Sequence, residues 1–317
     1  MLPFKQIESH QLMKQNLRAF FTKSPEPIIQ SLAPFQNGIF VDVLREDLMF
    51  PVLSGNKFRK LKYHLIENEF NCCLSFGGNY SNHVYALAEA KKLFGFDVHV
   101  FHPNTNCFTP TLTFAKQAGV HLHPLPYSQF RKRADPNFIQ ECMRKVNAEY
   151  CIPEGGAGDL GIKGCMEILA HPAIKLHKYD AVAVAAGTGN MLAGIMMYLE
   201  KIGSKMPIIV QSALKQVQHI EQLITDLKLN IQLSADTNRI HLYAETEFGG
   251  FGKYNQTLIE FMLNQYHLNK LEFDHVYTAK LLHRLQQMEH YSSFKRVLMI
   301  HSGGLQGRNG MQKDLKD

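Results

Sequence analysis

The sequence predicts an α/β protein built on an open, twisted, mainly parallel sheet with helices on both faces, and the chain is long enough for one large domain or two smaller ones. From about residue 70 onward, short β-rich runs alternate with amphipathic segments of roughly ten to fifteen residues. The run at residues 181–186 is apolar at every position, as in a central parallel strand that is covered on both faces. A chain of 317 residues, 45% of them hydrophobic, can bury a large core.

Strand, loop and helix follow one another in a regular order. Residues 71–76 form the first expected strand, and a turn over residues 77–80 leads to Ser81, the expected N-cap of a helix. The other expected strands lie at residues 96–101, 120–125, a run ending at 153, 181–186, 208–211, 239–243 and 297–301. Helices are expected near residues 111–118, 137–148 and 162–169.

Charge and cysteine content limit the function classes. The net charge is +6, but the basic residues are dispersed and the tightest cluster is Arg131-Lys132-Arg133, so we expect no nucleic-acid partner. No run resembles a signal peptide or approaches about 18 uncharged apolar residues, so we expect a cytoplasmic protein with no membrane partner. The six cysteines lack C-x-x-C spacing and are interpreted as reduced thiols.

Lys57 is the candidate nucleophile. It lies in Ser-Gly-Asn-Lys-Phe-Arg-Lys-Leu, residues 54–61, just after a glycine and at the expected start of a helix. The positive end of the helix dipole and the charges of Arg59 and Lys60 lower the pKa of an amine placed there. Such a lysine is suited to form an imine, whereas a lysine without this setting would be interpreted as a solvated surface residue.

A glycine-rich loop at residues 187–194 is the candidate phosphate site. It follows the buried run 181–186 and opens a helix, so its backbone N–H groups and the helix dipole can hold a phosphate. A dinucleotide fingerprint requires a third glycine where Leu192 stands and an acidic residue at the end of the next strand, and both are missing. A nicotinamide cofactor is therefore disfavoured.

Two further candidates compete with structural interpretations. Ser81 lies in Gly-Asn-Tyr-Ser-Asn, which is not the G-x-S-x-G elbow of an acyl-transfer nucleophile, so the role of a plain helix cap stays open. His121 and His123 would point to the same side of a strand. No third ligand is spaced nearby in the sequence, so we expect no metal site.

The chain resembles the fold-type II pyridoxal-phosphate enzymes, which share the tryptophan synthase beta-like fold. The similar branch contains 1-aminocyclopropane-1-carboxylate deaminase and D-cysteine desulfhydrase, and the resemblance extends from about residue 24 to residue 310. Its most specific parts are Leu-Ser-Gly-Asn-Lys-Phe-Arg-Lys at residues 53–60, similar to the cofactor-lysine motif, and Tyr-Ser-Asn-His at residues 80–83, similar to the Q-S-N-H substrate loop. Four further matches follow in the family's order, at residues 152–156, 187–194, 276–280 and 301–304.

The resemblance implies pyridoxal 5'-phosphate as the cofactor and a small amino acid as the substrate. Lys57 would hold the cofactor through an imine, Tyr277 would stack on the cofactor ring, and Ser302 would meet the pyridine nitrogen. Asn82 would bond the ring hydroxyl. The phosphate would be held by Lys60 and by Gly187, Thr188, Gly189, Asn190 and Met191.

The implied catalytic residues are Lys57, Ser81 and Tyr277, and the substrate carboxylate would be bound by Ser81, Asn82 and His83. The resemblance also implies a homodimer whose subunits have a large pyridoxal-phosphate-binding domain, residues 1–50 and 165–317, and a small domain, residues 51–164.

Several positions depart from the family pattern. Tyr80 replaces a glutamine, Tyr85 an arginine, and Asn190 and Met191 a glycine and a threonine. Thr278 and Phe251 replace the glutamate and a tyrosine of the deaminase.

Thr278 and Phe251, with the neutral hydroxyl of Ser302, favour elimination of a β-leaving group. We therefore expect β-elimination and deamination of a small amino acid to a keto acid and ammonia, as in D-cysteine desulfhydrase. The alternatives are 1-aminocyclopropane-1-carboxylate deaminase and a pyridoxal-phosphate-binding protein without turnover.

Overall fold

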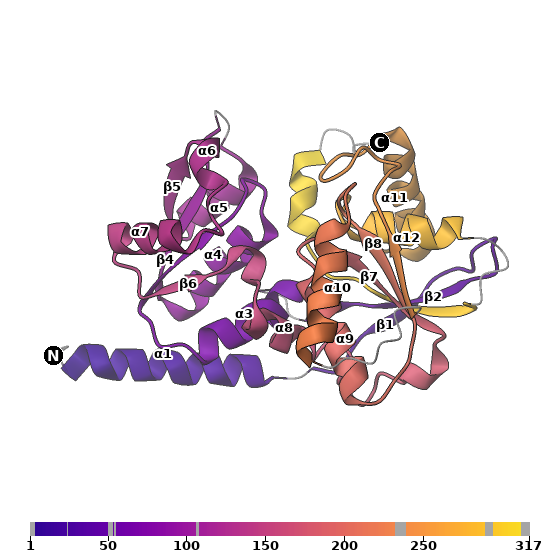
Figure 1. Ribbon diagram of the computed structural model, residues 1–317, viewed down its shortest axis with the longest axis horizontal. Coiled ribbons are helices and arrows are strands. Elements are labelled where there is room, and N and C mark those ends of the chain that lie inside the picture. Colours follow the sequence, from indigo (N-terminus) through magenta and orange to yellow (C-terminus); the bar gives the residue numbers. More distant parts are fainter. Residues whose placement is uncertain are drawn as a thin grey trace. The chain divides into compact units, whose positions relative to one another are not determined.

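The computed structural model describes residues 4–23, 25–49, 53, 55–105, 108–231, 239–288 and 294–311 (Figure 1). The chain divides into two compact units: unit 1 comprises residues 1–25 and 57–164, and unit 2 comprises residues 26–56 and 165–317. Residues 1–25, expected in the large domain, thus group with residues 57–164. The expected boundary at residues 50 and 51 lies outside the described residues, and the assignment of functional domains stays a prediction.

Unit 1 contains a four-stranded parallel sheet with the strand order β5-β4-β3-β6. The strands are β3 (Cys72–Phe76), β4 (Asp97–Pro103), β5 (His121–Leu125) and β6 (Tyr150–Ile152). The helices are α1 (Phe4–Thr22), α3 (Asn56–Ile66), α4 (Asn82–Phe94), α5 (Pro110–Gln117), α6 (Tyr127–Phe130), α7 (Pro136–Val146) and α8 (Asp159–Cys165). A short 3-10 helix, Glu154–Gly156, follows β6.

The core of unit 1 follows from the alternation of side chains along its strands. Phe76 on β3 and Phe101 on β4 lie on one face of the sheet, with ring centroids 5.6 Å apart. This face is covered by Phe130 of α6 and by Phe138 and Cys142 of α7. Both ends of α7 are closed locally, because Asp135 accepts hydrogen bonds from two backbone amides and Asn147 takes a left-handed conformation.

Unit 2 contains a six-stranded sheet with the order β1-β2-β10-β7-β8-β9, in which only β1 is antiparallel to its neighbour. The strands are β1 (Ile29–Ser31), β2 (Phe40–Leu44), β7 (Ala181–Ala186), β8 (Ile208–Ser212), β9 (Ile240–Tyr243) and β10 (Arg296–Ile300). The helices are α2 (Glu46–Met49), α9 (Asn190–Lys201), α10 (Gln218–Ile231), α11 (Gln256–Asn269) and α12 (Thr278–Gln287).

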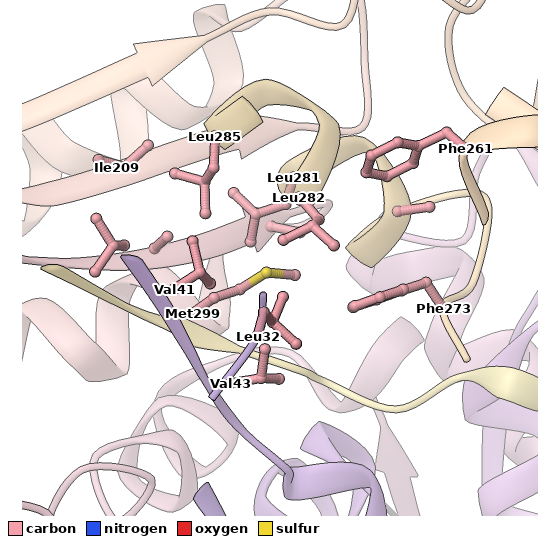
Figure 2. Packing of buried hydrophobic residues seen from close by; sticks show 14 of the residues in the cluster. Leu32, Val41, Val43, Ile209, Phe261, Phe273, Leu281, Leu282, Leu285 and Met299 are labelled. Carbon is pink, nitrogen blue, oxygen red and sulfur yellow. The ribbon is translucent and has the colours of Figure 1, made fainter. Parts of the chain in front are cut away.

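One face of the unit 2 sheet forms the main hydrophobic core (Figure 2). Val41 and Val43 of β2 and Met299 of β10 point toward Leu281 and Leu285 of α12. All five side chains are buried, so they contribute the largest favourable term of folding, about 25 cal/mol per Å² of apolar surface removed from water. Because this face of the sheet is tightly packed, the ends of its strands are held in fixed positions.

The expected elements from residue 70 onward are confirmed to within about two residues, except that the helix expected at 162–169 lies at Asp159–Cys165. The run at residues 181–186 is the strand β7, buried along its whole length. None of the helices in the described part of the chain has both the length and the apolar character that crossing a bilayer requires. The five cysteines in the described ranges are free thiols, and Cys107 lies outside those ranges.

The parallel strands of each unit bring their following loops to one edge of their sheet. In unit 1 this edge carries the loop after β3, which contains Ser81, and the glycines after β6. In unit 2 it carries the loop 187–189 after β7 and the segment 301–304 after β10.

Candidate functional site

Lys57 is the second residue of α3, at the helix start that the sequence predicts. The glycine turn before it is required by close contact: a Cβ at Gly55 would lie 2.1 Å from the carbonyl oxygen of Ser302, and the φ angle of Gly55 is +65°. The backbone N–H of Asn56 donates to the same oxygen at 3.0 Å. Ser302 therefore fixes the backbone that directly precedes Lys57. Ser54 lies outside the described residues.

The buried residues Arg59 and Lys60 of α3 lie against the glycines after β6. A Cβ at Gly156 would lie 3.0 Å from the Cβ of Lys60, and one at Gly164 would lie 1.8 Å from the carbonyl oxygen of Arg59. Gly164 must be glycine because the helix backbone leaves no room for a side chain, and Gly156 has a φ of +69°, which favours glycine. The backbone of α3 in unit 1 is therefore fixed by glycine contacts.

His64 adds a polar attachment of α3 to the same region. Its Nδ1 lies 2.8 Å from the hydroxyl of Tyr150, and its Nε2 lies 3.1 Å from the carbonyl oxygen of Ala157. Since a carbonyl oxygen only accepts, Nε2 carries the proton and Nδ1 accepts from the tyrosine. Burial lowers the pKa of His64 below its usual value. A neutral His64 suits both bonds.

Ser81 is confirmed as the N-cap of α4. Its Oγ accepts hydrogen bonds from the backbone N–H groups of His83 at 3.2 Å and of Val84 at 3.4 Å. The neighbouring departures from the family pattern lie at different depths: Tyr80 is 55% exposed, whereas the ring of Tyr85 stacks on Phe114 with centroids 4.2 Å apart. The roles expected for Ser81, Asn82 and His83 toward substrate stay predictions.

The side chain of His83 is held by a contact that sequence reasoning did not find. Ser75 on β3 donates its hydroxyl hydrogen to the carbonyl oxygen of Ile152 at 2.6 Å, so His83 Nε2, 2.8 Å from the same hydroxyl, must be the donor. The Nδ1 atom is buried and has no hydrogen-bond partner among the described residues. Burial lowers the pKa of His83 well below its usual value, and the electrostatic effect of the nearby Lys57, His64 and Lys60 adds to this.

In unit 2, the candidate phosphate loop connects β7 to α9. Gly189 has a φ of +85° and is the N-cap position of α9, so Asn190 and Met191 are the first residues of that helix. No described residue accepts a hydrogen bond from the backbone N–H groups of Gly187, Thr188 or Gly189. Open amides at a helix N-terminus can bind the oxygens of a phosphate. Met191 is buried and brings no hydroxyl.

Tyr277 lies against the same loop. A Cβ at Gly187 would lie 3.0 Å from Cε1 and 3.1 Å from the hydroxyl of Tyr277, so only glycine leaves the ring its place. The edge of the exposed Phe251 ring meets Tyr277, with ring centroids 6.1 Å apart. Of the expected cofactor residues in unit 2, Gly187 and Tyr277 are thus in contact.

A buried ion pair holds the loop that carries Phe251. Lys280 Nζ lies 3.4 Å from the Glu245 carboxylate, both side chains are 1% exposed, and Lys280 also donates to the carbonyl oxygen of Gly250 at 2.8 Å. Glu245 accepts from the backbone N–H groups of Phe248 and Gly250. The hydrogen bonds compensate the cost of burying both charges.

Ser302 follows β10 and is mostly buried. The preceding residue, His301, is fully buried; its Nε2 donates to the carbonyl oxygen of Glu272 at 2.7 Å, and its Nδ1 accepts from the backbone N–H of Gly303 at 3.3 Å. Asp47, 3.4 Å from Nδ1, is paired with Arg45 by two short hydrogen bonds of 2.9 and 2.7 Å. The residues on both sides of Ser302 are therefore held in place, His301 by its bond to Glu272 and Gly303 by its bond to His301.

His121 and His123, which were weighed as metal ligands, both lie on the edge strand β5 of unit 1. The structure brings a third, His99 of β4, next to them: His99 Nδ1 lies 2.9 Å from His123 Nε2, and the rings of His99 and His121 stack at 4.5 Å. The short N–N distance is a hydrogen bond between two imidazoles, one donating and one accepting. Within the described ranges, no group of three such side chains has the geometry to hold a metal ion.

The donor types present suit pyridoxal phosphate. The loop 187–189 offers backbone amides to a phosphate, Tyr277 offers an aromatic ring beside that loop, and Ser302 offers a neutral hydroxyl. In unit 1, Lys57 offers an amine at a helix start. Each donor belongs to the set that the sequence resemblance implies.

The chain is similar to characterised protein families along most of its length. A family model described as "Pyridoxal-phosphate dependent enzyme" matches residues 25–303. A protein of Thermotoga maritima named putative 1-aminocyclopropane-1-carboxylate deaminase is 27% identical over 287 residues, which cover 85% of this chain and 90% of the relative. A mitochondrial protein of Arabidopsis thaliana named bifunctional D-cysteine desulfhydrase/1-aminocyclopropane-1-carboxylate deaminase is 23% identical over 308 residues, covering 89% and 77%.

Solved structures agree with the fold expected from the sequence. A structure described as an ACC deaminase homologue has a TM-score of 0.79 and 23% identity, and covers 95% of this chain and 98% of that chain. Maize serine racemase has a TM-score of 0.65 and 14% identity, with 98% of both chains covered. These likenesses confirm the fold class.

Proposed function

Because this chain belongs to the pyridoxal-phosphate dependent enzyme family, we propose that it eliminates a β-substituent from a small amino acid such as D-cysteine. The products are a keto acid, ammonia and the leaving group, which for D-cysteine is hydrogen sulfide. Membership of this family implies the cofactor but does not specify the substrate.

The observation that carries the proposal is the hydrogen bonding of Thr278, which replaces the deaminase glutamate. Its buried hydroxyl donates to the carboxylate of Asp274 at 2.5 Å. Asp274 also accepts from the backbone N–H groups of residues 276–278 at 2.7 to 3.0 Å. Thr278 and Asp274 together close the start of α12, so neither side chain is left to move a proton at a substrate carbon.

Two further positions support elimination over ring opening. Phe251, in place of the second deaminase tyrosine, places a ring without a hydroxyl beside Tyr277. Ser302 presents a neutral hydroxyl, which holds a pyridine nitrogen protonated less well than a carboxylate does. Electron density is then less strongly withdrawn into the ring, which favours prompt loss of a β-substituent.

Pyridoxal phosphate, when bound, supplies an electron sink next to the α-carbon of the substrate. In the proposed assignment Lys57 would carry it, Asn82 and Ser302 would bond its ring, and Tyr277 would stack on that ring. Lys60 and residues 187–191 would hold its phosphate. The substrate carboxylate would be bound by the hydroxyl of Ser81 and by the backbone of Asn82 and His83.

The residues of the chain then have these tasks. Once the substrate amine has taken its place on the cofactor, the freed amine of Lys57 would accept the proton from the α-carbon at Nζ. The electron pair of that C–H bond forms a Cα–Cβ double bond while the Cβ–S bond of D-cysteine breaks, and the sulfur leaves with its bonding electrons. Hydrolysis of the released unsaturated amine by one water gives the keto acid and ammonia.

The test is a comparison of keto-acid formation from D-cysteine, β-chloro-D-alanine, their L-enantiomers and 1-aminocyclopropane-1-carboxylate. We expect faster product formation from the D-amino acids than from the cyclopropane, because position 278 offers no free acid or base. The Lys57→Ala variant serves as the control and should form no product from any of them.

Efficient ring opening by the unmodified protein would overturn the proposal. So would a cofactor-loaded protein that forms no keto acid from any compound, since it would be a pyridoxal-phosphate-binding protein without turnover. Product formed equally well by Lys57→Ala would show that another group does the chemistry.

The second candidate is 1-aminocyclopropane-1-carboxylate deaminase. It is favoured by the names of the relatives, since the Thermotoga maritima and Pyrococcus abyssi proteins, 27% and 25% identical, are both named putative deaminases of this kind. The same substrate comparison separates the two activities. The cytoplasmic location and the homodimer stay predictions.

A further inference from the structure

The outer side of the candidate phosphate loop is backed by α10. His219, in the first turn of α10, donates from Nε2 to the carbonyl oxygen of Gly187 at 2.8 Å. One turn later, Leu223 lies against Gly189, where an added Cβ would be 2.3 Å from Leu223 Cδ2. Positions i and i+4 share one face of a helix, so α10 contacts the loop at two points.

The hydrogen bond from His219 fixes the direction of a loop amide. The described chain contains no cis peptide bond, and in a planar trans peptide the C=O and the N–H point to opposite sides. Because the carbonyl of Gly187 points at His219, the N–H of Thr188 points away from α10. That N–H is one of the loop donors for which no described residue supplies an acceptor.

The opposite arrangement would weaken an anion site. If the 187–188 peptide turned over, its carbonyl oxygen would take the place of the Thr188 N–H and would repel a phosphate oxygen. Glycine on the carbonyl side makes such a turn sterically easy, because residue 187 has no Cβ to oppose it. A hydrogen bond to the carbonyl oxygen of Gly187 therefore stabilises the peptide orientation that an anion site requires.

We propose that His219 is a positioning residue of the cofactor site, which orients the 187–188 peptide so that the Thr188 N–H faces the cofactor phosphate. The inference rests on the proposed placement of the phosphate at residues 187–191. It assigns His219 no contact with substrate or cofactor.

The test is binding of pyridoxal phosphate and of pyridoxal to the cofactor-stripped chain, measured by absorbance titration for the His219→Ala and His219→Gln variants. Loss of one partly exposed hydrogen bond should weaken binding of pyridoxal phosphate by about fivefold in His219→Ala. Binding of pyridoxal, which has no phosphate, should not change. His219→Gln keeps an N–H donor and should restore most of the affinity.

Gln222→Ala is the matched control, because Gln222 is exposed on the same helix and, among the described residues, its side chain bonds Asp226 alone. It should bind pyridoxal phosphate like the parent chain. Equal weakening for pyridoxal, unchanged affinity in His219→Ala, or no recovery in His219→Gln would overturn the proposal. Since the readout is binding, it stands apart from the substrate comparison: a chain that forms no keto acid can still show the phosphate-specific loss.

Discussion

Ser81 combines a structural task with a proposed chemical one. Its hydroxyl oxygen accepts two backbone hydrogen bonds at the start of α4, and the resemblance gives the same hydroxyl to the substrate carboxylate and to proton transfer. An oxygen has two lone pairs and one hydrogen, so the cap leaves the hydrogen available to donate. One side chain can therefore serve both tasks at once.

We expect Ser81→Ala to slow turnover by roughly a hundredfold or more, the scale for losing a positioned proton-transfer group. The same change removes the N-cap and should lower the free energy of unfolding by about 1 kcal/mol. Steady-state kinetics and urea unfolding measure the two effects, and the visible spectrum of the bound cofactor should survive.

Asp135→Ala separates the two effects, because Asp135 is the exposed N-cap of α7 and has no proposed role in the chemistry. It should lose similar stability and keep full turnover. A fully active Ser81→Ala variant would reduce Ser81 to a helix cap.

Single residues of the site differ in how far the sequence predicts them. The helix start at Lys57 and the cap at Ser81 depend on neighbours within a few positions, and both are confirmed. The bond between His83 and Ser75 depends on a register in space between β3, β6 and α4, and the contact of His219 with Gly187 joins residues 32 positions apart. No local pattern encodes such contacts.

At the scale of elements, β7, its loop and α9 form the most predictable part of the molecule. Six apolar residues followed by glycines specify a covered strand and a turn. The position of Met191 was less predictable: it is 3% exposed, so its side chain belongs to the core rather than to the surface of the loop. Backbone donors of the loop must then do most of the phosphate binding.

Met191→Thr tests whether the backbone donors of the loop do most of the phosphate binding. The change adds a hydroxyl in the first turn of α9, so binding of pyridoxal phosphate should tighten or stay unchanged in a cofactor titration. Because a buried Met is lost, the free energy of unfolding should fall by about 1 to 3 kcal/mol.

Met196→Thr provides the control, since Met196 is equally buried one turn further along the same helix. It should lose stability without any change in cofactor affinity. A clear weakening of cofactor binding in Met191→Thr alone would mean that the phosphate is held elsewhere.

The sequence predicted no bounds for several elements, among them β1 and β2 before residue 70 and α10, α11 and α12 after it. Strands β1 and β2 are three and five residues long and lie before the regular succession of strand, loop and helix that begins near residue 70, and β1 pairs antiparallel at the edge of the sheet. Helix α1 groups with unit 1 although unit 2 follows it directly in the chain. The order of elements in the sequence does not indicate that the chain passes from unit 1 to unit 2 and back.

At the scale of the whole molecule, unfolding should depend on pH through the histidines of unit 1. Burial, together with the neighbouring His121 and His123, lowers the pKa of His99 to about 4, although Asp97 acts in the opposite direction. Between about pH 6.5 and 4 the unfolded chain therefore binds a proton that the folded chain does not, and stability falls as the pH falls through this window.

We expect the urea midpoint of the parent chain to fall more between pH 7 and pH 5 than that of His99→Gln. The corresponding difference in the free energy of unfolding should be on the order of 1 kcal/mol, because His99 is partly exposed and solvent screens its charge. His177→Gln, which replaces an exposed histidine, should follow the parent chain. Identical pH dependence in the parent and His99→Gln would contradict the assignment.

The strand order of unit 2 has a consequence for how the chain is made. The strand β10, residues 296–300, lies between β2 and β7 and pairs with both, so among the described strands it alone joins β1 and β2 to the rest of the unit 2 sheet. A ribosome that has synthesised the first 290 residues has produced a sheet in two separate pieces, with Val41 and Val43 still lacking their β10 neighbours. The nascent chain must keep these apolar strands from aggregating until β10 has been synthesised, because the two pieces of the sheet can join only then.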